Sequence, residues 1–255
     1  FSSSSSFADA LLSPRSVALV GASGDVRKNT ARPLRFMRKH GYSGTVYPIN
    51  AARAEILGER AYPSLRNLPG PVDHVFVMIP GNEVAALLPA CAEAGARVVT
   101  VYSDGFGETG PDGQARQAAL VAQARGLGLR LLGPNSIGLA DLHTGGILSV
   151  NAAFEADTLL PGDISMVSQS GSMMGSLLSR AAARMRGKPA VKVGSARSSS
   201  RCINWRTCGS RSRPGPKASR RTEPWTSACA TTYGRLNLAS KAVAGEKLPV
   251  TSRAV

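Results

Sequence analysis

A short glycine-rich segment near the start of the chain has the composition of a phosphate-binding loop. Gly21, Ala22, Ser23 and Gly24 follow directly on the apolar run Val17–Val20. A loop of this kind at the end of a buried strand lets backbone amides face a phosphate group. It has only two of the three glycines of the dinucleotide fingerprint G-x-G-x-x-G, so it indicates a nucleotide-type ligand without specifying which. A tight strand-to-helix turn that binds nothing is the alternative.

The residues after the second apolar run narrow the choice of ligand. Proteins that bind NAD through this fingerprint carry an acidic residue here, which holds a free ribose diol. In this chain the run Thr45–Ile49 is followed by Asn50, and Arg53 lies close by. An uncharged amide and a cation suit a phosphorylated ribose better than a free diol. Asn50 and Arg53 therefore argue against NAD as the ligand and favour NADP or coenzyme A.

Two further loops are expected at the same edge of the sheet. Ile79 and Pro80 end the third apolar run, at the carboxyl end of a strand, where open α/β sheets bind ligands. Asp104 and Gly105 follow the fourth run, and the glycine permits close approach of the backbone to a ligand. Ordinary strand-to-helix turns explain both loops equally well, and Asp104 or Glu108 could be a helix cap or a solvated charge.

Two later turns are more informative. Asn135 and Ser136 belong to a Gly-Pro-Asn-Ser turn after the fifth apolar run. Ser170 and Gly171 belong to a Ser-Gln-Ser-Gly-Ser cluster that precedes a helical stretch. Exposed amides and hydroxyls at a helix N-terminus form an anion site. A plain helix cap would explain one of these serines, but hardly the whole cluster.

A regular alternation of apolar runs and helical stretches must position these loops. The expected strands are Val17–Val20, Thr45–Ile49, His74–Ile79, Arg97–Tyr102 and Leu129–Leu132. Helices are expected over 30–40, 82–94 and 112–125, with Asn82 as a cap and Pro111 at a helix start. Strands separated by helices of this length imply right-handed βαβ units. The sequence predicts an α/β fold, a Rossmann-like parallel sheet with helices on both faces.

A second, incomplete α/β (flavodoxin-like) domain is expected after the first. Its candidate elements are the strands Ile147–Val150 and Ile164–Ser168 and the helix Met173–Arg184. No apolar periodicity continues beyond Lys188. The expected organisation is a disordered start over 1–7, a ligand-binding domain over 8–142, the start of a second domain over 145–187 and a basic tail over 188–255.

Six short motifs together resemble one family. Val-Gly-Ala-Ser, Tyr-Pro-Ile-Asn, Ile-Pro-Gly, Ser-Asp-Gly-Phe-Gly-Glu, Gly-Pro-Asn-Ser-Ile-Gly and Ser-Gln-Ser-Gly occur in this order within residues 8–187. The set resembles the CoA-binding half of the nucleoside-diphosphate-forming acyl-CoA synthetases, relatives of the succinyl-CoA synthetase alpha subunit. The resemblance implies that a second-domain turn presents Ser170 and Gly171 to a phosphate. It also implies that coenzyme A is bound by Gly21, Ala22, Ser23, Gly24, Asn50, Arg53, Ile79, Pro80, Asp104, Gly105, Asn135 and Ser136.

The family's reaction needs parts that this sequence does not show. Its members convert an acid, coenzyme A and ATP into acyl-CoA, ADP and phosphate, and a histidine in a Ser-His-x-Gly segment relays the phosphoryl group. After His143 this chain has no further histidine and no Gly-Asn-Glu turn to support such a phosphohistidine. We therefore expect coenzyme A binding without a complete catalytic apparatus. ATP and Mg²⁺ would bind only through missing domains, such as an ATP-grasp subunit or domain acting as partner.

Two alternatives stay open at this point. One is a CoA-sensing regulatory module of an acyltransferase, and the other is an NADP-binding oxidoreductase domain. None of the three histidines has an acidic or nucleophilic partner at useful spacing, so no catalytic residue is expected. The four cysteines show no C-x-x-C spacing and no nearby histidine, so neither a metal site nor a disulfide framework is expected.

The positive charge is concentrated at the end of the chain. Residues 188–255 hold 14 Lys and Arg but only 2 Asp and Glu, within a net charge of +15 for the whole chain. The abrupt change in composition near Gly187 favours a reading-frame change or truncation over a nucleic-acid-binding arm or an inert disordered extension, and nucleic acid is not an expected partner. With no signal peptide and no long apolar segment, we expect a cytoplasmic protein without a membrane span. The missing initiator methionine suggests a fragment of a longer protein.

Overall fold

A computed structural model describes residues 6–157, 159–162 and 165–185 of the 255-residue chain. The expected basic tail over 188–255 lies outside the described residues, as does the composition change near Gly187. None of the helices in the described part combines the length and the hydropathy that a membrane span needs.

The centre of the described part is a five-stranded parallel sheet in the order β2-β1-β5-β6-β7. Its strands are β1 (Ser16–Val20), β2 (Thr45–Ile49), β5 (His74–Val77), β6 (Val98–Val101) and β7 (Arg130–Leu132). Val20 pairs with Ile49 on one side and with Val77 on the other, so these strands end at the same level. From β1 the chain continues to β2 on one side of the sheet and then crosses to β5, β6 and β7 on the other side. The strand order therefore reverses between β1 and β5. Doubly wound sheets bind ligands at this switch point, beside the carboxyl ends of the strands.

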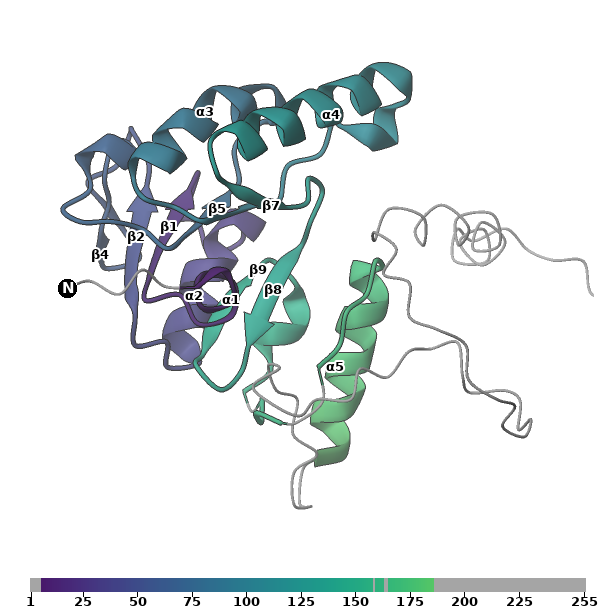
Figure 1. Ribbon diagram of the computed structural model, residues 1–255. Helices are drawn as coiled ribbons and strands as arrows, with labels where there is room; N and C mark the ends of the chain where they lie inside the picture. Colours follow the sequence, from purple (N-terminus) through teal and green to yellow (C-terminus); the bar gives the residue numbers. More distant parts are fainter. Residues whose placement is uncertain (1–5, 158, 163–164, 186–255) are drawn as a thin grey trace, which may run out of the picture. The chain divides into compact units, whose positions relative to one another are not determined.

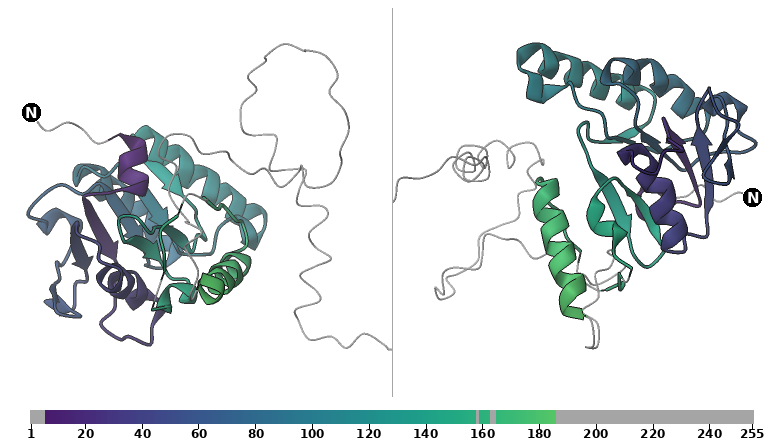
Figure 2. Two further views of the ribbon diagram at one scale, coloured as in Figure 1. Left: turned by 90° about the horizontal axis from the view of Figure 1, so that it is seen from below. Right: turned by 180° about the vertical axis from the view of Figure 1, so that it is seen from behind.

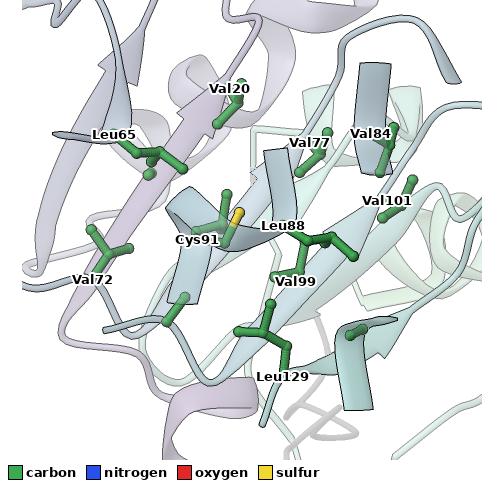
Figure 3. Close-up of a cluster of buried hydrophobic side chains, with 14 of the residues drawn as sticks. Val20, Leu65, Val72, Val77, Val84, Leu88, Cys91, Val99, Val101 and Leu129 are labelled. Atoms are coloured by element: carbon green, nitrogen blue, oxygen red, sulfur yellow. The ribbon is translucent and has the colours of Figure 1, made fainter. Parts of the chain in front are cut away.

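Helices α3 (Gly81–Glu93) and α4 (Pro111–Gly126) cover one face of the sheet, as Figure 1 shows. Alternate strand residues such as Val75 and Val77 point toward these helices, because side chains alternate across a strand. They pack with Leu88 and Cys91 of α3 in the cluster drawn in Figure 3. Valine-rich runs form these strands because β-branched side chains fit a sheet that is buried on both faces.

The opposite face is covered by α2 (Arg32–Lys39) and by a hairpin of β8 (Gly138–Asp141) and β9 (Gly146–Ser149), visible in both views of Figure 2. Leu148 of β9 is fully buried with Leu34 and Met37 of α2. The expected domain boundary between 142 and 145 is therefore wrong. The apolar run that was expected to begin a second sheet instead pairs antiparallel with the preceding strand and completes the first core.

The basic side chains of α2 hold it against the segment that follows the hairpin. Arg32 Nη1 donates to the carbonyl of Val150 at 2.9 Å. Arg35 forms a two-pronged pair with Glu155, with N–O distances of 3.1 and 2.9 Å. Lys39 Nζ donates to the Glu155 carbonyl. Paired guanidinium–carboxylate contacts of this kind fix orientation as well as charge, so these cations have a structural role.

The observed helix starts agree only in part with those expected from the sequence. Helix α1 (Phe7–Leu12) begins with Ser6 as its N-cap, so the disorder expected over 1–7 does not extend to Ser6 and Phe7. Pro111 begins α4 as expected. Asn82 is not a cap, because α3 begins one residue earlier and Pro80 occupies the N-cap position. With φ −52° and ψ 141°, Pro80 has the non-helical backbone that is typical of an N-cap residue.

Smaller elements complete the described part: η1 (Asn29–Ala31), the hairpin β3 (Glu55–Ile56) and β4 (Glu59–Arg60), η2 (Leu65–Asn67), η3 (Gly107–Thr109), η4 (Ala152–Glu155) and α5 (Gly171–Met185). Helix α5 agrees with the expected helix 173–184. The expected strand 164–168 is not formed over its described residues, 165–168. No strand follows Ser149 in the described part, so an extended segment there has no neighbour to complete a ladder. The described residues thus show no second sheet of the expected flavodoxin-like domain.

Candidate functional site

The glycine-rich loop lies at the switch point of the sheet. Gly21 follows β1 directly, and its amide donates to the carbonyl of Ile49 at 3.1 Å. Its φ is +83°, and a Cβ at this position would lie 2.9 Å from the carbonyl oxygen of Met78. Only glycine combines this left-handed backbone with such a close neighbour. The loop is therefore held between the ends of β2 and β5, where a ligand of a doubly wound sheet is expected.

Asn50 connects the loops after β1 and β2. Its Nδ2 donates to the carbonyl of Ala22 at 3.0 Å, and its Oδ1 accepts from the Ala52 amide at 2.9 Å. Ser23 stabilises the same loop, since its Oγ accepts from the Asp25 amide at 3.1 Å. The sequence pointed to Asn50 for its neutral side chain; the structure adds that this side chain holds the loop in place.

Arg53 is a cation beside the glycine-rich loop. Its side chain is exposed, and Nη1 lies 3.9 Å from the position that a Cβ would take at Gly24. Within the described ranges, no carboxylate pairs with this guanidinium and no hydrogen bond occupies it. An unpaired guanidinium beside exposed loop amides can bind a phosphate through several donors.

The turns after β5 and β6 contact each other. Ser103 Oγ donates to the carbonyl of Ile79. A side chain at Gly81 would collide with the carbonyl oxygen of Asp104, so glycine allows the two turns to approach. Pro80 and Asp104 are exposed at this edge.

The Gly105 turn already has an anion on its amides. Glu108 Oε1 accepts from the amide of Gly105 at 2.5 Å and from that of Phe106 at 3.0 Å. The amides of Glu108 itself, Phe106 and Gly105 lower the pKa of this carboxyl, and Arg116 contributes by its charge. The sequence left open whether Glu108 is a helix cap or a solvated charge. In the structure, the Glu108 carboxylate accepts hydrogen bonds from two amides of its own turn.

The loop after β7 joins the same edge of the sheet. The Asn135 amide donates to the carbonyl of Ser103 at 2.9 Å, and the Ser136 amide donates to that of Val101 at 3.1 Å. Asn135 has a φ of +52°, and its side chain is exposed. The structure therefore brings the turns that contain Ile79, Gly105 and Asn135 together through direct hydrogen bonds.

Ser170 and Gly171 lie at the start of α5. Ser170 Oγ accepts from the Met173 amide at 3.3 Å, so this serine acts as a helix cap. A Cβ at Gly171 would lie 2.7 Å from Cδ1 of Ile137, which follows the Asn135-Ser136 turn. Asn151 Nδ2 donates to the Gly171 carbonyl at 3.1 Å. The N-terminus of α5 is thus packed beside the loop that follows β7.

Sequence reasoning missed a contact between Asn29 and Tyr102. Asn29 Nδ2 donates to the Tyr102 hydroxyl at 3.4 Å, which joins the loop after β1 to the end of β6. The position of Tyr102 directly after an apolar run could have drawn attention to it, whereas nothing local distinguishes Asn29. A shallow surface hollow lies elsewhere, between the N-terminal half of α5 and residues 151–153.

The histidines are bonded within the fold. His40 and His143 each place Nε2 near a backbone carbonyl, that of Phe154 at 2.9 Å and that of Gly162 at 3.3 Å. His74 is fully buried, and burial lowers its pKa from 6.5 to about 4. Among the described residues, no three side chains of His, Cys, Asp or Glu come together in a group that could hold a metal ion.

The region that carries these loops has recognisable relatives. Residues 15–141 match the family model of the CoA binding domain. This part of the chain is a CoA-binding domain. The match includes the glycine-rich loop, Arg53, the Gly105 turn and the Asn135-Ser136 turn, and it ends within the hairpin that completes the core.

Two curated relatives of this chain are much longer than the matched region. The chain is 35% identical over 169 residues to the alpha subunit of acetate–CoA ligase (ADP-forming) I from Pyrococcus furiosus, covering 65% of this chain and 36% of the relative. It is 30% identical over 181 residues to 4-hydroxybutyrate–CoA ligase (ADP-forming) from Nitrosopumilus maritimus, covering 71% of this chain and 26% of the relative. The chain thus spans about a third or less of these relatives.

Solved structures agree with this assignment of the CoA-binding domain. The structure matches the dinucleotide-forming acetyl-coenzyme A synthetase 1 of Candidatus Korarchaeum cryptofilum with a TM-score of 0.66 and 28% identity. The match covers 73% of this chain and 38% of that one. The resemblance to ADP-forming acyl-CoA synthetases that the six motifs suggested is confirmed, and so is the Rossmann-like fold.

Proposed function

We propose that the described domain binds coenzyme A along the carboxyl edge of its parallel sheet. The observation that carries this proposal is the joint position of the Gly21–Gly24 loop and Arg53 at the switch point, inside the region that matches the CoA-binding domain. The loop amides would take a phosphate, as glycine-rich loops before helices do. The turns that contain Ile79, Gly105 and Asn135 would line the remainder of the ligand.

Arg53 is proposed to bind the phosphate on the ribose of coenzyme A. Its guanidinium is exposed, lies beside Gly24 and has no carboxylate partner among the described residues. Coenzyme A carries a phosphate on this ribose and dephospho-coenzyme A does not, so the two ligands differ in the group that Arg53 would recognise. A charge-assisted contact of this kind is worth about 1.5–3 kcal/mol, which corresponds to roughly ten- to hundredfold in affinity.

The whole protein is proposed to take part in ADP-forming acyl-CoA synthesis from an acid, coenzyme A and ATP. The relatives that are named for this reaction support the proposal, and their names include different acids, so the acyl group stays unassigned. The described residues contain the part that would hold coenzyme A. The ATP-dependent steps would need parts that these residues do not include, in an ATP-grasp subunit or domain.

Calorimetric titration of the full chain tests the proposal. We expect saturable binding of coenzyme A and weaker binding of dephospho-coenzyme A. Arg53→Gln should weaken coenzyme A binding about tenfold or more and leave dephospho-coenzyme A binding nearly unchanged. Arg66→Gln is the matched control, because Arg66 is exposed but pairs with Glu93 at 2.9 Å.

Two outcomes would contradict the proposal. Binding of NADP without any response to coenzyme A would favour an oxidoreductase domain instead. Equal losses for coenzyme A and dephospho-coenzyme A in the Arg53 variant would show that Arg53 does not recognise the ribose phosphate.

A further inference from the structure

The Gly105 turn has the features of an anion site that is already occupied. Two consecutive amides, those of Gly105 and Phe106, point at one carboxylate oxygen of Glu108. Gly105 has a φ of +89°, and successive amides around such a residue form a concave nest that binds anions. Here the anion is a side chain of the same turn.

A guanidinium completes this site. Arg116 Nη2 donates to the carbonyl of Gly105 at 2.9 Å and contacts Thr109 Oγ1 at 3.2 Å. Its charge contributes to lowering the pKa of the Glu108 carboxyl, after the contribution of the backbone amides. Two amides and one cation are the donors that a phosphate would use, so the turn could hold a phosphate if Glu108 were absent.

Other contacts hold the turn in place besides Glu108. Phe106 is buried, and its ring lies against Gly81 at the start of α3. The Gly107 amide donates to Gln117 Oε1 at 3.1 Å, and Thr109 Oγ1 donates to the Phe106 carbonyl at 2.8 Å. Loss of the Glu108 carboxylate would therefore free the two amides without removing all support of the turn.

We propose that Glu108 is a specificity-determining residue that keeps phosphate groups out of the Gly105 turn. Its carboxylate occupies the two amides that a phosphate would need, and the exposed carboxylate of Asp104 on the same turn adds charge of the same sign. This inference rests on the proposed binding of coenzyme A. It assigns the phosphates of that ligand to the Gly21–Gly24 loop and Arg53, and leaves an uncharged part of the ligand for the Gly105 turn.

Amide NMR spectra of the ¹⁵N-labelled full chain, titrated with inorganic phosphate, test this proposal without coenzyme A. In the unchanged protein the Gly105 and Phe106 resonances should not respond to phosphate. In Glu108→Ala they should shift saturably, because two amides and Arg116 become available. Glu108→Gln keeps an oxygen acceptor in place and should not respond. Asp112→Ala, which removes an exposed carboxylate from the first turn of α4, is the matched control and should also give no response.

Each result decides the proposal. A saturable phosphate response at Gly105 and Phe106 in the unchanged protein would overturn it, as would the lack of one in folded Glu108→Ala. If Glu108→Ala does not fold, Glu108→Ser removes the same carboxylate, keeps a polar residue and is judged by the same criterion. A second titration with coenzyme A separates the two proposals: no shift at Gly21–Gly24 would contradict coenzyme A binding, while the phosphate result at Glu108 would still stand.

Discussion

Acid should destabilise the domain through His74. This ring is fully buried between α1 and the sheet. Its Nδ1 donates to the carbonyl of Ala10 at 3.2 Å, and its Nε2 accepts from the Thr100 hydroxyl at 2.7 Å. The Ala10 carbonyl can only accept a hydrogen bond, so it fixes the proton on Nδ1. Burial keeps the ring neutral, and Nε2 then uses its lone pair for the Thr100 hydroxyl.

The magnitude follows from the change in pKa. Burial lowers the pKa of His74 from 6.5 to about 4, against opposing contributions from the Ala10 carbonyl and Asp73. One pKa unit corresponds to about 1.4 kcal/mol, so the neutral ring contributes about 3 kcal/mol to the free energy of unfolding. The folded state binds fewer protons than the unfolded state. This contribution is therefore complete above pH 6.5 and is lost as the pH falls toward 4.

Urea unfolding followed by circular dichroism, at several pH values between about 7 and 4, measures this contribution. We expect the free energy of unfolding of the unchanged protein to fall by about 3 kcal/mol more than that of His74→Asn over this range. Asp25 and Glu108 have lowered pKa values, so their protonation in acid also lowers the free energy of unfolding. This loss is the same in both proteins and cancels when the two are compared. Parallel loss of stability in the two proteins would refute the reasoning.

Two further predictions concern the loop and the hairpin. Gly21→Ala should lower the free energy of unfolding by about 1–3 kcal/mol, because alanine is strained at a φ of +83° and its Cβ would meet the Met78 carbonyl; a stability equal to that of the unchanged protein would contradict the close approach. Leu148→Ala should lower the same quantity by about 2–5 kcal/mol, because Leu148 is fully buried with Leu34 and Met37. Thermal and urea unfolding measure both, and a loss below 1 kcal/mol for Leu148→Ala would show that the hairpin is not part of this core.

The strands of the parallel sheet could be predicted because each is a short apolar run between turn residues. Observed and expected bounds agree for β2 and differ by one or two residues elsewhere, as at β5, which ends at Val77 rather than Ile79. The parallel direction of the strands follows the same logic, since consecutive βαβ units place the loops that follow the strands at one edge. The expected site residues before Ser170 lie in loops that the structure places at this edge.

The pairing of β9 could not be predicted from its apolar run. Ile147 and Leu148 would be buried equally well in a new parallel sheet or in a hairpin with β8, and the antiparallel pairing decides between them. The run that includes Val167 shows the opposite case: its apolar residues do not form a strand over 165–168, and the Val167 side chain is almost fully exposed. Apolar composition allows a strand, but a neighbour must complete its hydrogen bonds.

The role of the Glu108 side chain could not be predicted from the sequence. Its sequence position was compatible with a helix cap or a solvated charge, and the backbone turn around Gly105 determines which amides its carboxylate can reach. Asn50 is similar, because its contact with Ala22 depends on how two loops approach in space.

The hairpin β8–β9 also sets a lower limit on the length of a fragment that we expect to fold. A fragment cut after residue 142 would lose β9 and expose the apolar side of α2, with Leu34 and Met37 uncovered and the edge of β8 unpaired. Exposed apolar patches and free strand edges promote aggregation. The fragment cut after residue 142 would also lose Glu155, the partner of Arg35. A usable fragment, and any fusion to another protein, should therefore extend at least through Asp157, beyond the point where the family match ends at residue 141.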